Sequence, residues 1–320
     1  MTFLLPLKLA AFAAALAVPS APMAVWPSTT PASAPLAKKL SVVATTADLA
    51  VLARAIGGDA IDVKALAKPT EDPHFVDAKP SHIITLNRAD VLLDGGAELE
   101  MGWLPSLLES ARNDRIAAGA PGRISASAGI RMMEIPTSFD RSKGDVHALG
   151  NPHFLLDPMN VRIVVARIAE HLTTVDPANA AVYKGNLERF LATLDAKLPA
   201  WQQALAPFKG AKIVTYHKDF GYLAARFRLD VVETLEPKPG ISPSPAHLAQ
   251  VIGTMKSQGA HVILVQPYQN RRTAETVARQ SGATVLDVAQ QPGAVPNTDT
   301  YFALMDNIVR ILVTGLQGSR

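Results

Sequence analysis

The chain has 320 residues, of which 48% are hydrophobic and 18% are charged. This composition excludes a disordered or fibrous protein, and the length allows one large domain or two medium domains with their own cores. The 31 lysines and arginines against 28 aspartates and glutamates give a formal net charge of only +3. Because the basic residues are scattered, we expect no nucleic-acid partner.

The sequence contains no cysteine. Disulfide bonds therefore cannot stabilise the fold, and no lipid can be attached through an N-terminal cysteine. A metal site in this chain would have to use imidazole and oxygen ligands instead of thiolates.

Residues 1–34 differ in composition from the rest of the chain. One lysine is their only charge, Leu9–Val18 is an apolar run rich in alanine, and small residues and prolines follow up to Ala32-Ser33-Ala34. This order predicts a secretory signal peptide, because the apolar run is too short to span a bilayer. We expect residues 1–34 to be removed and the mature protein to be periplasmic. An N-terminal membrane anchor is the alternative, and cleavage near Ala21 or Ala24 stays open.

From residue 40 onward, short β-branched or aliphatic runs alternate with amphipathic segments. This alternation predicts an α/β fold with parallel sheets covered by helices. In the first half, the expected strands are Leu40–Thr45, Ile61–Leu66 and Val91–Leu93, and the expected helices are Ala47–Ile56, Pro80–Asn87 and Trp103–Arg112.

A similar pattern restarts at residue 211, so we predict a second α/β lobe. Its expected strands are Lys212–Tyr216, Val231–Thr234, Val262–Gln266 and Thr284–Val288. Its expected helices are Phe220–Phe227, Ala246–Gln258, Thr273–Gln280 and Tyr301–Leu316.

A different kind of segment lies between the two lobes. Asp176-Pro177 is typical of a helix start, and apolar residues follow at helical spacing. A helix over Pro177–Leu198 would be roughly 33 Å long, enough to run along both lobes. Pro199 should end or kink it. The expected organisation is a signal peptide at 1–34, an N-terminal lobe at 35–175, a linking helix at 176–206 and a C-terminal lobe at 207–320.

Three of the eight histidines lie in loops that a parallel sheet would place at its ligand crevice. His217 directly follows an expected strand, and loops after strand ends line the crevice of an open α/β sheet. His74 and His153 each lie in a Pro-His-Phe sequence before a helix, where the proline restricts the loop. These three are candidate metal ligands. Surface or hydrogen-bonded loop histidines are the alternative.

Several motifs occur in one order along the chain. They are Pro73-His74-Phe75 with Lys79-Pro80-Ser81, Gly95-Gly96 followed by Glu100 and Trp103-Leu104, Asn151-Pro152-His153 with Leu156-Asp157-Pro158, and Tyr216-His217 with Phe220 and Tyr222. As a set they resemble the metal-specific cluster of ABC-transporter solute-binding proteins, which includes zinc and manganese binders. The resemblance runs from about residue 40 to the C-terminus.

The resemblance implies two α/β lobes joined by one long rigid helix, with a metal ion in the cleft between them. It assigns His74, His153 and His217 as three ligands, and some members, notably manganese binders, have glutamate in the third place. The fourth ligand would be a carboxylate after the last strand of the second lobe. Asp287 best fits that place, and Asp299 is the alternative.

The chain departs from many zinc binders of this family in two loops. Many zinc binders of the family carry a long insertion rich in histidine and acidic residues before the second histidine, whereas this chain has only the short segment from Thr137 to Gly150. We expect its His147 to be a plain loop residue, with a weak auxiliary ligand as the alternative. Glu236–Pro245 resembles the family's loop at the lobe interface but is unusually rich in proline.

We therefore expect the periplasmic solute-binding component of an ABC importer. It would act as a monomer, capture a divalent metal ion as its transported ligand and deliver it to a permease and ATPase in the inner membrane. Three imidazoles and one carboxylate favour zinc over manganese, and manganese or iron is the alternative cargo. An exported zinc hydrolase is less favoured, because the sequence has no His-Glu-x-x-His, no Gly-x-Ser-x-Gly and no cysteine. A binding protein for an organic solute would show a more aromatic site.

Overall fold

The computed structural model describes residues 1–3, 38–136, 147–238 and 240–318. Residues 1–38 form a unit of their own, and the fold considered below is the compact unit Lys39–Arg320. The predicted signal peptide lies almost wholly outside the described residues, so its removal stays a prediction. Among the helices of the described ranges, none is long and apolar enough to cross a membrane.

The first lobe is built on a four-stranded parallel sheet of order β2-β1-β3-β4. Its central strand β3 is buried over its whole length, as expected for a parallel sheet covered on both faces. The strands are β1 (Leu40–Ala44), β2 (Ile61–Ala65), β3 (Val91–Asp94) and β4 (Arg123–Ser125), and the helices are α1 (Ala47–Gly57), α2 (Pro80–Arg88), α3 (Leu104–Ala111) and α4 (Pro158–Val175).

The second lobe repeats this topology with the strand order β6-β5-β7-β8. Its strands are β5 (Lys212–Thr215), β6 (Asp230–Thr234), β7 (Val262–Val265) and β8 (Thr284–Asp287), and its helices are α6 (Gly221–Phe227), α7 (Pro245–Gln258), α8 (Arg271–Ser281) and α9 (Tyr301–Gln317). The predicted α/β fold with two parallel sheets is confirmed. The short strand β4 was not predicted, because three residues are too few to show a periodicity.

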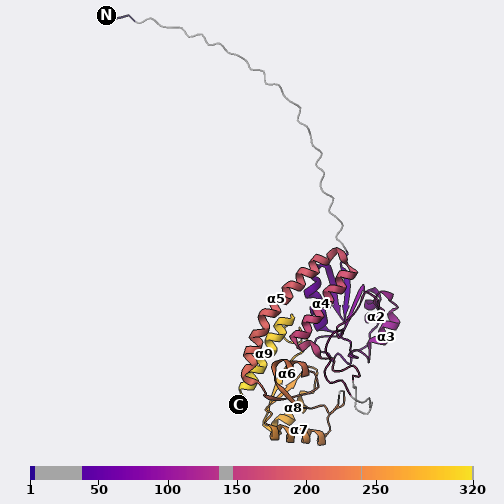
Figure 1. The fold of residues 1–320 in the computed structure, drawn as a ribbon, viewed down its shortest axis with the longest axis vertical. Coiled ribbons are helices and arrows are strands. Elements are labelled where there is room, and N and C mark those ends of the chain that lie inside the picture. The colour runs from indigo at the N-terminus through magenta and orange to yellow at the C-terminus, as the bar shows by residue number, and fades with distance from the viewer. Residues whose placement is uncertain (4–37, 137–146, 239, 319–320) are drawn as a thin grey trace. The chain divides into compact units, whose positions relative to one another are not determined.

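Helix α5 (Ala180–Leu205) packs against α1 and α4 of the first lobe and α9 of the second (Figure 1). The expected start at Pro177 is wrong, because residues 177–179 form a separate 3₁₀ turn. Pro199 does not end the helix but lies inside it. Trp201 and Leu205, beyond the proline, are buried in the core, and their burial offsets the hydrogen bond that proline cannot donate.

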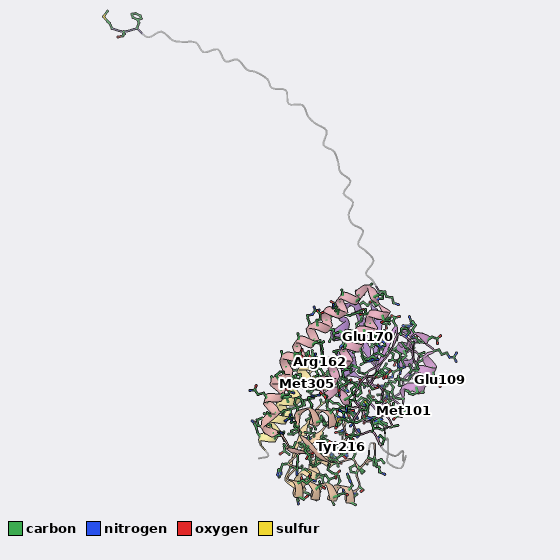
Figure 2. The ribbon with its side chains drawn as sticks, viewed as in Figure 1. Met101, Glu109, Arg162, Glu170, Tyr216 and Met305 are labelled. Carbon is green, nitrogen blue, oxygen red and sulfur yellow. The ribbon has the colours of Figure 1, made fainter. Side chains whose placement is uncertain are left out.

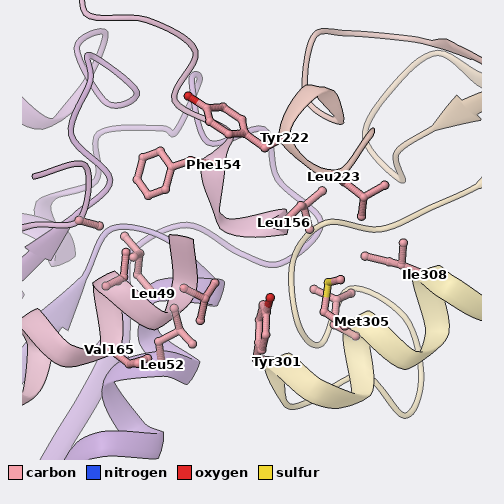
Figure 3. Packing of buried hydrophobic residues seen from close by; sticks show 14 of the residues in the cluster. Leu49, Leu52, Phe154, Leu156, Val165, Tyr222, Leu223, Tyr301, Met305 and Ile308 are labelled. Atoms are coloured by element: carbon pink, nitrogen blue, oxygen red, sulfur yellow. The ribbon is translucent and has the colours of Figure 1, made fainter. Parts of the chain in front are cut away.

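One apolar cluster extends across both lobes (Figure 3). Leu49 and Phe154 come from the first lobe, and Tyr222 and Tyr301 come from the second. The rings of Phe154 and Tyr222 lie 6.4 Å apart and nearly perpendicular, which is a favourable aromatic geometry. Figure 2 shows the side chains on the ribbon, among them Met305 of α9, which belongs to this cluster. Because the lobes share this core, they cannot separate widely without exposing apolar surface to water.

A buried acid holds the loop that follows β3. Glu100 is 4% exposed, and its Oε1 accepts hydrogen bonds from Thr45 Oγ1 at 2.5 Å and from the backbone N–H of Gly95 at 2.7 Å. Burial, with a smaller contribution from the nearby Asp94, raises the pKa of Glu100 to about 7. Below about pH 7 the folded protein therefore favours the protonated form of this side chain.

We expect Glu100→Gln to stabilise the protein at alkaline pH and to leave it unchanged near pH 4.5. A carboxyl pKa raised from 4.5 to about 7 lowers stability as pH rises through that window, and the full effect is about 3 kcal/mol above pH 7. Glutamine keeps the oxygen that accepts both hydrogen bonds. Urea unfolding at pH 4.5 and pH 8 measures the difference, with the exposed Glu109→Gln on α3 as the control. If Glu100→Gln lost the same stability at both pH values, the raised pKa of Glu100 would be contradicted.

Candidate metal site

Three histidines converge between the lobes. His74, His153 and His217 each offer one ring nitrogen such that these atoms all lie within 4.8 Å of one another. Their ring centroids are 5.0 to 5.4 Å apart, and the residues are only 7 to 9% exposed. His74 and His153 belong to the first lobe, and His217 belongs to the second. The structure thus brings together three of the four residues predicted as ligands.

His74 is fixed by the loop between β2 and α2. The carboxylate Oδ1 of Asp72 accepts from the backbone N–H of His74 at 3.0 Å and lies 2.9 Å from its ring Nδ1. The indole N–H of Trp103 donates to the carbonyl of Pro73 at 2.9 Å, which ties the loop to the start of α3. With Nδ1 bound to the carboxylate, the Nε2 atom of His74 is left to face the other imidazoles.

His217 lies two residues after the end of β5, and a second carboxylate orients its ring. The hydroxyl of Thr215 donates to the carbonyl of His217 at 2.6 Å, and Glu236 Oε2 lies 2.8 Å from His217 Nδ1. Burial alone would lower the pKa of His217, but the hydrogen bond to Glu236 and the charge of Asp219 raise it above its usual value. Glu236 follows β6, the neighbour of β5, so both side chains lie at the same edge of the sheet.

His153 presents a ring nitrogen that has no hydrogen-bond partner among the described residues. Its backbone N–H donates to the side-chain carbonyl of Asn151 at 2.9 Å, while its ring Nε2 is buried and makes no hydrogen bond. A buried polar atom without a partner is costly unless a ligand or water binds it. Burial, together with the charges of His74 and His217, lowers the pKa of His153 well below its usual value. The ring is therefore neutral, as metal ligation requires.

His147 lies next to His74, although it is not one of the three mutually close histidines and the sequence favoured a plain loop residue. Its Nε2 lies 3.2 Å from Nε2 of His74, and the two ring centroids are 5.2 Å apart. Zinc–nitrogen bonds of about 2.05 Å in a tetrahedron place neighbouring ligand atoms about 3.3 Å apart. Burial, and then the charge of His74, lowers the pKa of His147 to about 4, so this ring is neutral as well.

Asp287 is not part of this group. It is the last residue of β8, its side chain is 63% exposed, and it forms an ion pair with Arg271 at 3.1 Å. β8 lies at the edge of its sheet, where the side chain of Asp287 faces solvent and the first residue of α8. Asp299, the alternative, is also exposed. This arrangement gives no support to either carboxylate as the fourth ligand, and their roles stay predictions.

The sequence reasoning missed the two carboxylates that orient the rings. Asp72 could have been found from its spacing, because an aspartate two residues before another residue commonly accepts that residue's backbone N–H. Glu236 could have been found from sheet order, since it follows the strand beside β5. Outer carboxylates of this kind set the tautomer of a ligating histidine and raise its basicity.

Comparisons with known proteins agree with this architecture. Residues 42–315 match the profile of the family described as the periplasmic component A of the zinc-uptake complex, ZnuA. The iron ABC transporter substrate-binding lipoprotein MtsA of Streptococcus pyogenes serotype M1 is 27% identical over 281 residues, which cover 83% of this chain and 86% of MtsA. The high-affinity zinc uptake system protein ZnuA of Bacillus subtilis strain 168 is 26% identical over 250 residues, which cover 77% of this chain and 76% of that protein. A crystal structure of ZnuA shares the fold with a TM-score of 0.72 at 22% identity, over 87% of this chain and 100% of that one.

Proposed function

We propose that this chain, which belongs to the ZnuA family of periplasmic metal-binding components of ABC transporters, captures zinc and delivers it to its permease. The family consists of solute-binding proteins and not enzymes, and it implies a membrane permease and an ATPase as partners. The names of relatives differ in their metal, since MtsA is described as an iron protein and the Bacillus subtilis protein as a zinc protein. The metal of this chain must therefore be argued from its own site.

The observation that supports zinc is a set of buried ring nitrogens facing one another. His74, His153 and His217 offer three, and His147 Nε2 lies at the separation expected for two ligands of one tetrahedral ion. Imidazole suits zinc, whereas manganese is better served by carboxylate and water oxygens. Manganese also stands lowest in the affinity order of the first-row divalent ions, so a nitrogen-rich site does not prefer it.

The same geometry supports capture over catalysis. A catalytic zinc site keeps one position open for water, whereas a structural or carrier site closes the shell with protein ligands. With His147 as a fourth ligand, four imidazoles would surround the ion and leave no position for a reactive water. One chain supplies all four, so a monomer is sufficient. Because His217 belongs to the second lobe and the other three to the first, a bound ion links the two lobes.

We expect alanine at His74, His153 or His217 to weaken zinc binding more than the about 10- to 100-fold that loss of an outer partner typically costs. His147→Ala should raise the zinc Kd as well. Matched controls are His171→Ala and His247→Ala, in α4 and α7, together with Asp287→Asn. Competition against a zinc chelator measures the Kd of each variant. An equal rise in zinc Kd for all variants, controls included, would refute the assignment of these histidines as ligands. If Asp287→Asn raised the Kd and His147→Ala left it unchanged, Asp287 would replace His147 as the fourth ligand.

We expect zinc to displace manganese by a wide margin, and His217→Glu to narrow that margin. Glutamate would replace one imidazole by an oxygen ligand, which suits manganese better. Titration of metal-free protein with each ion, followed by competition at equimolar concentrations and neutral pH, measures the preference. Wild-type protein that retained manganese against equimolar zinc would refute the zinc assignment but not the transport role.

We also propose that the chain reaches the periplasm through cleavage of residues 1–34. Mass spectrometry of the exported protein should show an N-terminus near Ala34, because the apolar run and small residues before it are typical of a signal peptide. Intact Met1 on the exported protein would contradict this.

A further inference from the structure

One asparagine connects two of the ligand loops across the boundary between the lobes. Asn151 is 6% exposed, and its Oδ1 accepts from the backbone N–H of His153 at 2.9 Å. Its Nδ2 donates to the carbonyl of Lys218, the residue after His217, at 2.7 Å, and to Oε1 of Glu134 at 3.1 Å. A single side chain is thus bonded to His153 itself and to the direct neighbour of His217.

The main chain of Asn151 is held from both sides. Its N–H donates to the carbonyl of Met133 at 2.8 Å, and its carbonyl accepts from the Tyr222 hydroxyl at 2.9 Å. The same hydroxyl accepts from the N–H of Met133 at 2.8 Å. Buried groups that are hydrogen-bonded so completely have a single low-energy orientation. The amide of Asn151 is therefore a fixed reference for both loops.

An amide is the side chain that these partners require. The backbone N–H of His153 needs an acceptor, and the carbonyl of Lys218 and the carboxylate of Glu134 need donors. Among short side chains only asparagine supplies an acceptor and two N–H donors at one end. An aspartate of the same shape would keep the bond from the His153 N–H. Its second oxygen would face the carbonyl of Lys218 and the carboxylate of Glu134, which are both acceptors, so both of these bonds would be lost.

We propose that Asn151 is a positioning residue that sets His153 and His217 at their ligating separation before the metal arrives. This inference rests on the proposed function of the site. Pre-set ligands need no reorganisation on binding, so affinity is gained without an extra contact to the ion. The other two imidazoles are held by different contacts. Trp103 holds the His74 loop through the carbonyl of Pro73. Glu98 accepts from the N–H of Ala148, the residue after His147.

The test compares wild-type protein with Asn151→Asp and Arg226→Gln. Arg226 of α6 forms a two-point ion pair with Asp157 at 2.7 and 2.8 Å, so it also links the lobes, but these bonds go to the start of α4 and not to His153 or Lys218. Zinc Kd, zinc dissociation rate, and the d–d absorption of the cobalt(II)-loaded protein are measured. Thermal melting of each metal-free protein reports the purely structural effect.

We expect Asn151→Asp to raise the zinc Kd by about 10- to 100-fold, to speed dissociation and to change the cobalt spectrum. Arg226→Gln should lower the melting temperature and leave Kd within about twofold of wild type with an unaltered spectrum. If Asn151→Asp does not fold, Asn151→Ser replaces it, because the serine hydroxyl can accept from the His153 N–H but is too short to reach Lys218.

Two outcomes would overturn the inference alone. They are a folded Asn151 variant with wild-type Kd and cobalt spectrum, and an Arg226→Gln protein that reproduces the full change of the Asn151 variant. Wild-type protein that bound neither zinc nor cobalt would instead overturn the proposed function, and this inference with it.

Discussion

The apolar core shared by the two lobes determines where the ligand loops can lie. Phe154, directly after His153, and Phe220, three residues after His217, are both fully buried in it. Each of these two loops is therefore anchored within a few residues by an aromatic side chain whose burial stabilises the fold by about 2 kcal/mol or more. The separation of His153 and His217 thus follows from how the shared core packs.

Much of the fold could be predicted because its signals are local. Period-two and helical patterns within ten residues indicated most of the strands and helices, and a histidine after a strand or a restricting proline indicated the three candidate ligands. Contacts between distant segments were not predictable in the same way. His147 meets His74 across 73 positions of sequence, and the orientation of Asp287 depends on its place on an edge strand and on Arg271. Pro199 is another case in which a local signal was not decisive. Burial of Trp201 and Leu205 in the core keeps α5 helical beyond the proline.

The shared core also limits how a bound ion can leave. The bidentate pair of Arg226 with Asp157 and the bond of Tyr222 to Asn151 cross the same boundary, and Gln291 of the second lobe is bonded to Asp48 of the first. Wide separation of the lobes would break all of these and expose apolar surface. A change confined to the His74 loop, which Trp103 ties to α3 of the same lobe, breaks none of these bonds.

Charge balance explains how a divalent ion can occupy a site that water scarcely reaches. A bare ion in such a place would be prohibitively costly, and neutral imidazoles supply no compensating charge. Asp72 and Glu236 each lie one hydrogen bond behind a candidate ligand, His74 and His217, and place carboxylate groups close to the site. A dication bound at the proposed site would therefore have carboxylates close behind its ligands, while the ring nitrogens of the three histidines would face it. Separating the countercharge from the ligating atoms in this way would allow a buried site to hold a dication and, under the proposed function, to favour zinc over ions that require oxygen.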